Sequence, residues 1–554
     1  MTSRVTRPWA LAGALLMPVA AAIARAQVAP TPMAPTQALP TLAPATPAGT
    51  TYAERYRPQY HFTPAANWMN DPNGLVFRDG EWHLFYQYNP FGNTWGHMSW
   101  GHAVSPDLVH WRHLPVAIPE ADGVMAFSGS AVVDGKNTSG FGQEGTPPLV
   151  AIYTGARDKS QAQYLAYSTD RGRTWTRHAG PVLDIGSAEF RDPKVFWYAP
   201  EQKWVMVVSL ATEHKVRLYS SPDLKRWTQL SEFGPAAATG GVWECPDLFE
   251  LPVDGNAKDT RWVLVVNLNP GGVAGGSGAQ YFVGRFDGTR FTADEATPPT
   301  ADAAATGVRW ADYGKDFYAA VSWSDVPRAD GRRIWVGWMN NWQYGNEIPT
   351  APWRSAQSLP RMVALKTTSE GIRLVQEPVR ELQQLRGARR QIEARAIPAG
   401  STSLAAQGIA GKALEIAAEF EVGTGAAGSA REFGLKVRTG NGEETVVGID
   451  PTAGQLIVDR TRSGETRFDK AFSGRQTAPL VVENGRVRLR IFVDWSSVEV
   501  FSGDGQVVIT DQIFPAPESD GVALYATGGT ARLVSLTAWP LASAWTPAPR
   551  RAGL

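Results

Sequence analysis

The sequence predicts an all-β protein, a five-bladed β-propeller followed by a C-terminal β-sandwich. Three observations support this prediction. Short runs of β-branched and aromatic residues recur between turn signals from Tyr56 onward, and convincing helical periodicity is absent up to Leu365. A Ser-x-Asp turn followed by an aromatic residue repeats along the first half of the chain. After Leu365 the composition changes, and a second set of alternating runs begins near Gly400.

The N-terminus has the pattern of a targeting segment, and we expect a signal peptide over residues 1–26. Two arginines precede an apolar run at 9–23, and Ala-Arg-Ala at 24–26 offers a cleavage site. An uncleaved anchor is the alternative. No later stretch has the length of apolar sequence that spans a bilayer, so we expect a secreted or periplasmic protein without stable membrane association after cleavage. Residues 27–52 are mostly Pro, Ala and Thr, which is typical of a disordered linker.

Charge and cysteine content limit the possible partners. Basic and acidic residues number 53 each, so the formal charge is zero, which argues against nucleic acid as the main partner. Cys245 is the only cysteine, so the chain has no intrachain disulfide. The eight histidines show no metal-ligand pattern. We therefore expect no metal and no cofactor.

The repeated turn predicts the blade architecture of residues 53–365. Copies with tryptophan occupy 105–111, 168–175 and 221–227, and a degenerate copy that ends in phenylalanine occupies 286–291. The aromatic residues that close the copies are 64, 52 and 64 residues apart. Such a period holds about four strands, so roughly 310 residues form five blades. A pair of stacked sandwiches is the alternative.

The remainder of the chain is expected to contain a linker and a second all-β unit. Residues 366–398 are interpreted as a linker with a short helix, because they contain the most helix-prone stretch of the chain. Residues 399–545 alternate again between apolar and polar side chains, which most simply indicates a two-sheet sandwich. Its polar residues form no evident catalytic set. We therefore interpret it as a packing or carbohydrate-contacting module.

Three acidic motifs fall at corresponding places in the expected propeller. Asp71 lies in the run WMNDPNG, early in the first blade. Asp192 lies in FRDP, early in the third blade, and Glu244 lies in VWECPD, early in the fourth. Because the first strand of a blade lines the central channel, the three carboxylates are expected to converge there. A capped turn is the alternative for an acidic residue before a proline.

Two of these carboxylates suit the cleavage of a glycosidic bond. That reaction uses one carboxyl group to attack the anomeric carbon and another to protonate the leaving oxygen. Asp71 is the candidate nucleophile, because Asn70 and the following turn offer donors that keep it ionised. Glu244 is the candidate acid/base, because its longer side chain can occupy a partly desolvated place.

Other polar and aromatic residues near the motifs have further expected roles. Asp192, beside Arg191, is expected to stay ionised, to bind sugar hydroxyls and to stabilise positive charge in the transition state. Cys245 directly follows the acid/base candidate, and neighbours on a strand face opposite sides. We expect a buried, inert thiol unless the backbone is irregular there. Trp68 and Trp338 are candidates to stack on a sugar, although packing between blades explains most of the 21 tryptophans.

The motifs resemble those of glycoside hydrolase family 32, the invertase and fructan-hydrolysing family, and occur in the same order. Besides the three acidic motifs, the matching runs are FYQYNP at 85–90, WGHMSWGHA at 95–103, FSGSAV at 127–132, DYGKDFYA at 312–319, GWMNNW at 337–342 and DWSSVEVF at 494–501. The resemblance covers roughly residues 56–540.

The resemblance implies a five-bladed propeller with a sandwich, a retaining mechanism through a fructosyl-enzyme, and the carboxylate roles given above. It also implies that the terminal fructose is held at Asn70, Gln87, Trp95, Ser128 and Arg191. Within the family the chain looks most similar to levanases and exo-inulinases, which implies removal of terminal fructose from β-2,6 or β-2,1 fructans, with some action on sucrose. An invertase or fructosyltransferase with the same carboxylates and a non-catalytic fructan-binding lectin are the alternatives.

Overall fold

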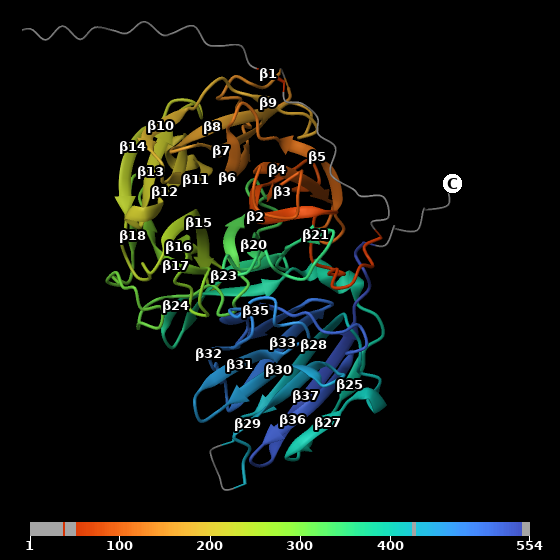
Figure 1. Ribbon diagram of the computed structural model, residues 1–554. Coiled ribbons are helices and arrows are strands. Elements are labelled where there is room, and N and C mark those ends of the chain that lie inside the picture. Colours follow the sequence, from red (N-terminus) through yellow and green to blue (C-terminus); the bar gives the residue numbers. More distant parts are fainter. Residues whose placement is uncertain (1–36, 39–50, 144, 424–427, 546–554) are drawn as a thin grey trace, which may run out of the picture. The chain divides into compact units, whose positions relative to one another are not determined.

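A computed structural model describes part of the 554-residue chain, namely residues 37–38, 51–143, 145–423 and 428–545 (Figure 1). The expected signal peptide, residues 1–26, lies outside the described residues, as does most of the expected linker at 27–52. Two residues of that linker, Gln37–Ala38, form strand β1, which pairs with β9 (Thr176–Arg177). Within the described ranges, no helix is long and apolar enough to cross a membrane.

The first three blades of the propeller follow one another along the chain. Blade I contains β2 (Asn67–Arg78), β3 (Glu81–Tyr88), β4 (Ser99–Ser105) and β5 (Arg112–Ile118), with β21 (Trp353–Arg354) beside β2. Blade II contains β6 (Met125–Val133), β7 (Leu149–Arg157), β8 (Ser160–Ser168) and β9, with β1 and β10 (Leu183–Ser187) added. Blade III contains β11 (Phe190–Tyr198), β12 (Lys203–Leu210), β13 (Lys215–Ser221) and β14 (Thr228–Phe233).

Two more blades complete the propeller. Blade IV contains β15 (Val242–Val253), β16 (Asn256–Asn269), β17 (Gly278–Phe286) and β18 (Phe291–Ala293). Blade V contains β19 (Tyr318–Ser322), β20 (Arg333–Met339), β23 (Arg361–Thr368) and β24 (Gly371–Pro378), with β22 (Ala356–Gln357) beside β20. The first strands β2, β6, β11 and β15 lie around the centre in Figure 1, and β5, β14 and β18 lie at the periphery. The predicted propeller is confirmed, and the alternative of two stacked sandwiches is wrong.

The repeated turn joins the third and fourth strands of the blades, as its spacing predicts. In blade I the amide N–H of Asp107 donates to Ser105 Oγ at 3.1 Å, and the indole N–H of Trp111 donates to the oxygen of Leu108 at 3.1 Å. The indole groups of Trp175 and Trp227 make the same type of bond, at 3.1 and 3.0 Å. The serine and aspartate close the turn, and the tryptophan packs back over it.

The C-terminal unit is the predicted sandwich of two antiparallel sheets. One sheet has the order β25 (Arg390–Ile392), β37 (Ala531–Pro540), β28 (Leu414–Glu421), β33 (Arg486–Asp494), β34 (Ser497–Ser502) and β35 (Val507–Gln512), with β26 (Arg395–Ile397) also paired to β37. The other has the order β27 (Gly400–Ser403), β36 (Gly521–Thr527), β29 (Glu432–Gly440), β30 (Glu443–Asp450), β31 (Gln455–Arg462) and β32 (Arg475–Pro479).

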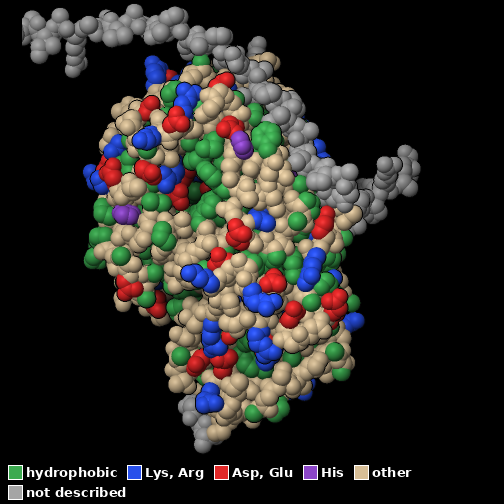
Figure 2. Space-filling view, in the orientation of Figure 1, with side chains coloured by type: hydrophobic (Ala, Val, Ile, Leu, Met, Phe, Trp, Pro, Cys, Tyr) green, Lys and Arg blue, Asp and Glu red, His purple; other side chains and the backbone are tan. Residues whose placement is uncertain are grey.

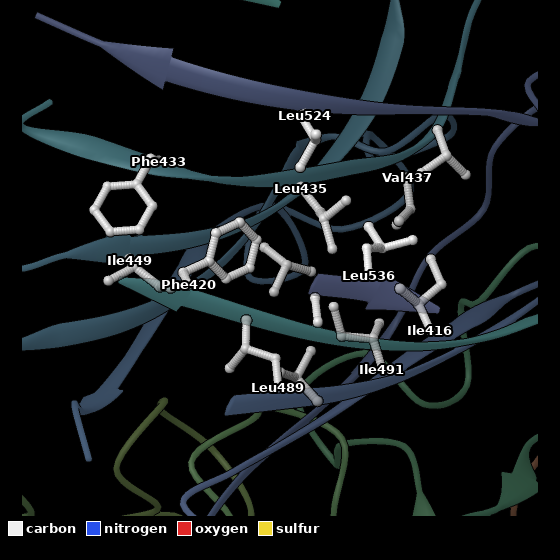
Figure 3. Packing of buried hydrophobic residues seen from close by; sticks show 14 of the residues in the cluster. Ile416, Phe420, Phe433, Leu435, Val437, Ile449, Leu489, Ile491, Leu524 and Leu536 are labelled. Atoms are coloured by element: carbon white, nitrogen blue, oxygen red, sulfur yellow. The ribbon is translucent and has the colours of Figure 1, made fainter. Parts of the chain in front are cut away.

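The sandwich core is apolar because alternate side chains of each strand point inward. Ile416 and Phe420 of β28 meet Phe433 and Leu435 of β29 between the sheets (Figure 3). Leu536 of β37 extends the same cluster. Burial of this cluster stabilises the unit by the hydrophobic effect.

The last blade continues beyond the expected boundary at Leu365. Strand β24 pairs with β23 over Gly371–Pro378, where a linker was expected. Arg373 and Gln376 are buried in it, so polar residues at buried positions concealed the strand from a search for apolar alternation. The expected short helix is the 3-10 helix η3 (Arg380–Leu385). The other 3-10 helices of the described chain are η1 (Ala199–Glu201), η2 (Ala211–Glu213) and η4 (Ala405–Gln407).

Buried ionic contacts join the propeller to the sandwich. Arg361 of β23 donates to Glu499 of β34 at 2.6 Å and to Asp312 at 2.9 Å. The two ring nitrogens of His61 lie 2.8 Å from Asp494 and 2.9 Å from Glu499. The run DWSSVEVF therefore supplies two buried carboxylates to this contact, and both bind propeller residues.

Candidate active site

Each acidic motif lies at a β-bulge beside a proline. The pairing of β2 with β3 shifts between Met69 and Pro72, so Asp71 falls in the irregular stretch. Strand β11 shifts between Arg191 and Lys194, and β15 shifts between Glu244 and Asp247. Proline has no N–H to give to a ladder, so a strand that contains it bulges there. A bulge re-aims the neighbouring side chains, which here are the three carboxylates.

Two residues inside these bulges have left-handed backbone conformations. Asp192 has φ of 65° and Cys245 has φ of 44°, and each directly precedes a proline. The two bulges are bonded to each other, because the N–H of Cys245 donates to Asp192 Oδ2 at 2.9 Å. The N–H of Asp192 donates in turn to Thr154 Oγ1 at 2.9 Å. Such conformations are costly for residues other than glycine, and these bonds stabilise them.

All five blades contribute a first-strand residue to one connected group. Ser128 of β6 donates to Asp71 Oδ2 at 2.6 Å, and the Cys245 thiol lies 3.6 Å from that oxygen and 3.6 Å from Asp192 Oδ2. Arg191 Nε donates to Glu244 Oε1 at 2.9 Å. The hydroxyl of Tyr318, on β19, donates to Glu244 Oε2. The predicted convergence of the three carboxylates in the channel therefore occurs.

The acidic side chains are shielded to different degrees. Asp71 is 8% exposed and Asp192 is 6% exposed, whereas the Glu244 side chain keeps 20% of its surface exposed. The molecular surface of the propeller is hollowed, with acidic and hydrophobic side chains inside the hollow (Figure 2). A recess of this kind can admit one end of a ligand and exclude water from the groups that line it.

Burial and mutual repulsion shift the ionisation of the two aspartates. Burial raises the pKa of Asp71, the hydrogen bond from Ser128 opposes this, and the charge of Glu244 raises the pKa further. Burial and then the charge of Glu244 raise the pKa of Asp192 to about 7, while the Arg191 guanidinium opposes them. A pKa of about 7 leaves Asp192 partly protonated near neutral pH, so the predicted ionised form is complete only at higher pH. Burial and the nearby charge of Glu244 are the main causes, and Arg191, which also bonds to Glu244 and Glu189, offsets them only in part.

Comparison with known proteins identifies the family. The model of the glycosyl hydrolases family 32 N-terminal domain matches residues 61–378, and that of the family 32 C-terminal domain matches residues 381–540. The chain belongs to glycoside hydrolase family 32. It is therefore a glycosidase, and the two matched domains correspond to the propeller and the sandwich.

Individual relatives agree with this assignment. A levanase of Bacillus subtilis is 56% identical over 90% of this chain and 72% of its own length. An extracellular exo-inulinase of Aspergillus awamori is 44% identical over 90% of this chain and 97% of its own. The crystal structure of the A. awamori exo-inulinase superposes with a TM-score of 0.82 at 42% identity, covering 89% of this chain and all of that one. A Schwanniomyces occidentalis β-fructofuranosidase with fructosyl-erythritol superposes with a TM-score of 0.79 at 32% identity, covering 90% and 100%.

Several expected sugar-binding residues of this family 32 enzyme surround the carboxylates. Asn70 Nδ2 donates to Asp71 Oδ1 at 3.1 Å, and Ser128 and Arg191 make the contacts described above. Gln87, on β3, donates to the oxygen of Ala126 at 2.9 Å. Trp95 is 41% exposed and lies edge-on to Phe127, with ring centroids 6.1 Å apart.

Trp68 and Trp338 lie behind the site. Both are fully buried and pack against each other and against Trp342, with centroid distances of 4.9 to 5.9 Å. The predicted stacking of either indole on a sugar is therefore wrong for this conformation. Trp68 acts on the site through its N–H, which donates to Asn70 Oδ1 at 2.8 Å. It orients the amide that contacts Asp71.

The prediction for Cys245 is only partly confirmed. The thiol is buried, and burial raises its pKa well above the usual value, so it stays protonated. It does not face away from the carboxylates, because the bulge breaks the alternation on which that expectation rested. Tyr318 was missed altogether as a contact of Glu244, although it lies in the run DYGKDFYA, which had been singled out as a match.

Proposed function

We propose that this chain is a secreted, retaining and exo-acting β-fructosidase. It would remove terminal fructose from levan or inulin-type fructans, and also from sucrose. The main observation behind this proposal is that Asp71 and Glu244 lie on the first strands of different blades and belong to one connected group with Asp192. The names of the levanase and the extracellular exo-inulinases support the substrate class and the location. The basic and apolar N-terminal pattern also supports export.

The first step is attack by Asp71 on the anomeric carbon of the terminal fructose. Ser128 and Asn70 each donate to a different oxygen of Asp71, at 2.6 and 3.1 Å, so the carboxylate is oriented before the substrate arrives. Glu244 gives its proton to the leaving oxygen as that bond breaks. The products are a free hydroxyl on the leaving sugar and a fructosyl ester on Asp71.

Water completes the reaction. The ionised Glu244 takes a proton from water, whose oxygen attacks the anomeric carbon and displaces Asp71. Arg191 and Tyr318 hold Glu244 from two directions, so the same carboxyl group can serve as acid and then as base. Two displacements retain the configuration of the fructose.

Asp192 contributes charge and hydrogen bonding. Its buried carboxylate, fixed by the N–H of Cys245 at 2.9 Å, can accept bonds from sugar hydroxyls. Positive charge develops on the sugar in the transition state, and a nearby carboxylate stabilises it.

The products formed early in the reaction test the proposed activity. Purified mature protein is incubated with levan, inulin and sucrose, and the products are separated by chromatography. Free fructose as the first product, released faster from a fructan than from sucrose, is the expected result. Fructo-oligosaccharides from the start would indicate endo attack, and longer products than the substrate would indicate transfer. Either result would overturn the exo-hydrolase proposal.

Asp71→Asn tests the nucleophile. Turnover is expected to fall by about 10⁴-fold, because the amide cannot form the fructosyl ester, while fructan binding persists. The exposed Asp79→Asn, at the far end of the same blade, is the matched control and should retain full activity. Substantial activity in Asp71→Asn would reassign the nucleophile.

A further inference from the structure

An unusual concentration of exposed aromatic surface lies on one loop of blade I. Among the described residues, four large hydrophobic side chains are exposed, namely Phe91, Trp95, Ile185 and Val482. Two of them belong to residues 89–98, which join β3 to β4. Phe91 is 69% exposed, the most of the four. Single exposed hydrophobic residues are common, but neighbouring ones on one loop form a candidate binding surface.

The loop begins at the end of the blade where the nucleophile lies. Met69 pairs with Tyr88, so the chain after Tyr88 starts beside the N-terminal end of β2. The N–H of Trp68 donates to the oxygen of Gly92 at 3.0 Å, and the N–H of Asn89 donates to the oxygen of Trp68 at 3.1 Å. Gly92, the residue after Phe91, is therefore hydrogen-bonded to β2, the strand that carries Asp71.

Hydrogen bonds fix the loop on both sides of the phenylalanine. The N–H of Phe91 donates to Asn89 Oδ1, and Asn89 Nδ2 donates to the oxygen of Thr94, both at 2.9 Å. The N–H of Trp95 donates to Asn346 Oδ1 at 3.0 Å, which ties the loop to the segment after β20. The backbone that carries Phe91 is thus ordered by hydrogen bonds before substrate arrives, which lowers the ordering cost of binding.

The two aromatic side chains of this loop are much more exposed than the candidate nucleophile. Asp71 is 8% exposed, Trp95 is 41% exposed and Phe91 is 69% exposed. Trp95 lies against Phe127, the neighbour of the Ser128 that bonds to Asp71. The Phe91 ring meets only the edge of His97 among aromatic rings of the described chain, with centroids 5.4 Å apart. Most of its surface is free for a ligand.

We propose that Phe91 binds a fructosyl unit of a polymeric substrate beyond the bond that is cleaved. This inference rests on the proposed exo-fructosidase function. When the terminal fructose occupies the recess, the rest of the polymer leaves through the rim, where apolar C–H groups of a sugar ring can pack on the phenyl ring. Sucrose has a single sugar beyond its cleaved bond and is too short to gain from an outer contact of this kind. Phe91 therefore favours fructans over sucrose.

Phe91→Ala tests this role through a ratio of substrates. The ratio of kcat/KM on levan or inulin to kcat/KM on sucrose is expected to fall about 5-fold, mostly through a higher KM on the polymer. Phe91→Tyr keeps the ring and should retain the parent ratio. Val482→Ala, at a 44% exposed position of the sandwich, is the matched control for loss of surface apolar area.

Two outcomes would overturn the inference. One is an unchanged substrate ratio in Phe91→Ala, and the other is an equal loss on sucrose and polymer, which would indicate general damage to the site. Failure of the proposed function itself would look different. The parent protein would then release no fructose from any of the three substrates.

Discussion

The side-chain amide of Gln357 donates a 2.9 Å hydrogen bond to the main-chain oxygen of Asn70, the residue before the candidate nucleophile. The N–H of Gln357 donates to the oxygen of Phe62 at 2.9 Å, beside His61. Two residues further along the chain, the N–H of Leu359 donates to Glu499 of the sandwich at 2.8 Å. The sandwich thus holds the two segments that lie behind the strand of Asp71.

Replacement of Gln357 by leucine should reduce turnover. Gln357→Leu leaves the oxygen of Asn70 without its donor in a buried place, so the backbone at Asp71 can shift. A displacement well below 1 Å is expected to lower kcat on the order of 10-fold. Steady-state kinetics on sucrose measure the effect.

A matched variant separates this effect from a general loss of stability. Gln376→Leu makes the same change at another buried glutamine, which bonds to Arg361 at 3.0 Å and to the oxygen of Ala311 but not to β2. Both variants should unfold at lower temperature, but only Gln357→Leu should lose kcat. Equal kcat values in the two variants would contradict the positioning role.

The thiol of Cys245 should contribute to the acid limb of activity. Burial raises the pKa of Asp71, and the hydrogen bond from Cys245 is one of three that oppose this, so Cys245→Ala should raise that pKa further and leave less of the nucleophile ionised in acid. The acid limb of the kcat/KM profile should move to higher pH, with a loss of about 5-fold on that limb. Cys245→Ser keeps a donor and should restore the parent profile. The same limb in Cys245→Ala and in the parent would show that the thiol only fills space.

The convergence of the carboxylates and the direction of the Cys245 side chain differ in how far the sequence could predict them. The convergence of Asp71, Asp192 and Glu244 was predictable, because a regular blade period places first strands at regular intervals. The direction of the Cys245 side chain was not, because a bulge reverses it and alternation assumes an unbroken strand. Trp338 shows a second limit. An indole suits a sugar platform and a packed interior equally well, and only the tertiary structure decides between them.

The pKa of Asp192 could not be predicted from the sequence either. It leads to a prediction about the stability of the fold. Its pKa is 3.8 in model compounds and about 7 in the fold, so folding becomes less favourable as pH rises between these values and Asp192 loses its proton. Asp192→Asn removes the charge and keeps an acceptor for the N–H of Cys245. The variant should be inactive yet more stable than the parent at pH 8, and by a smaller margin at pH 5. Denaturant unfolding at the two pH values measures this. If the variant were less stable than the parent at pH 8, the buried charge of Asp192 would not destabilise the fold, and the prediction would be wrong.

His61 should make the contact between propeller and sandwich sensitive to alkali. Burial alone would lower the pKa of His61, but its bonds to Asp494 and Glu499 outweigh burial and raise the pKa from 6.5 to about 9. The folded pKa exceeds the unfolded one, so the stabilisation is complete below pH 6.5 and is lost as pH rises toward and through 9. The melting temperature of the parent should therefore fall between pH 7 and pH 10, while His61→Gln should melt lower at pH 7 and depend less on pH over this range. His110→Gln, at a histidine whose side chain is 41% exposed and pairs with Asp107, is the control and should follow the parent curve. His61→Gln removes the charge of His61. If the melting temperatures of the parent and of this variant fell in parallel as pH rises, the loss of stability at alkaline pH would have another origin.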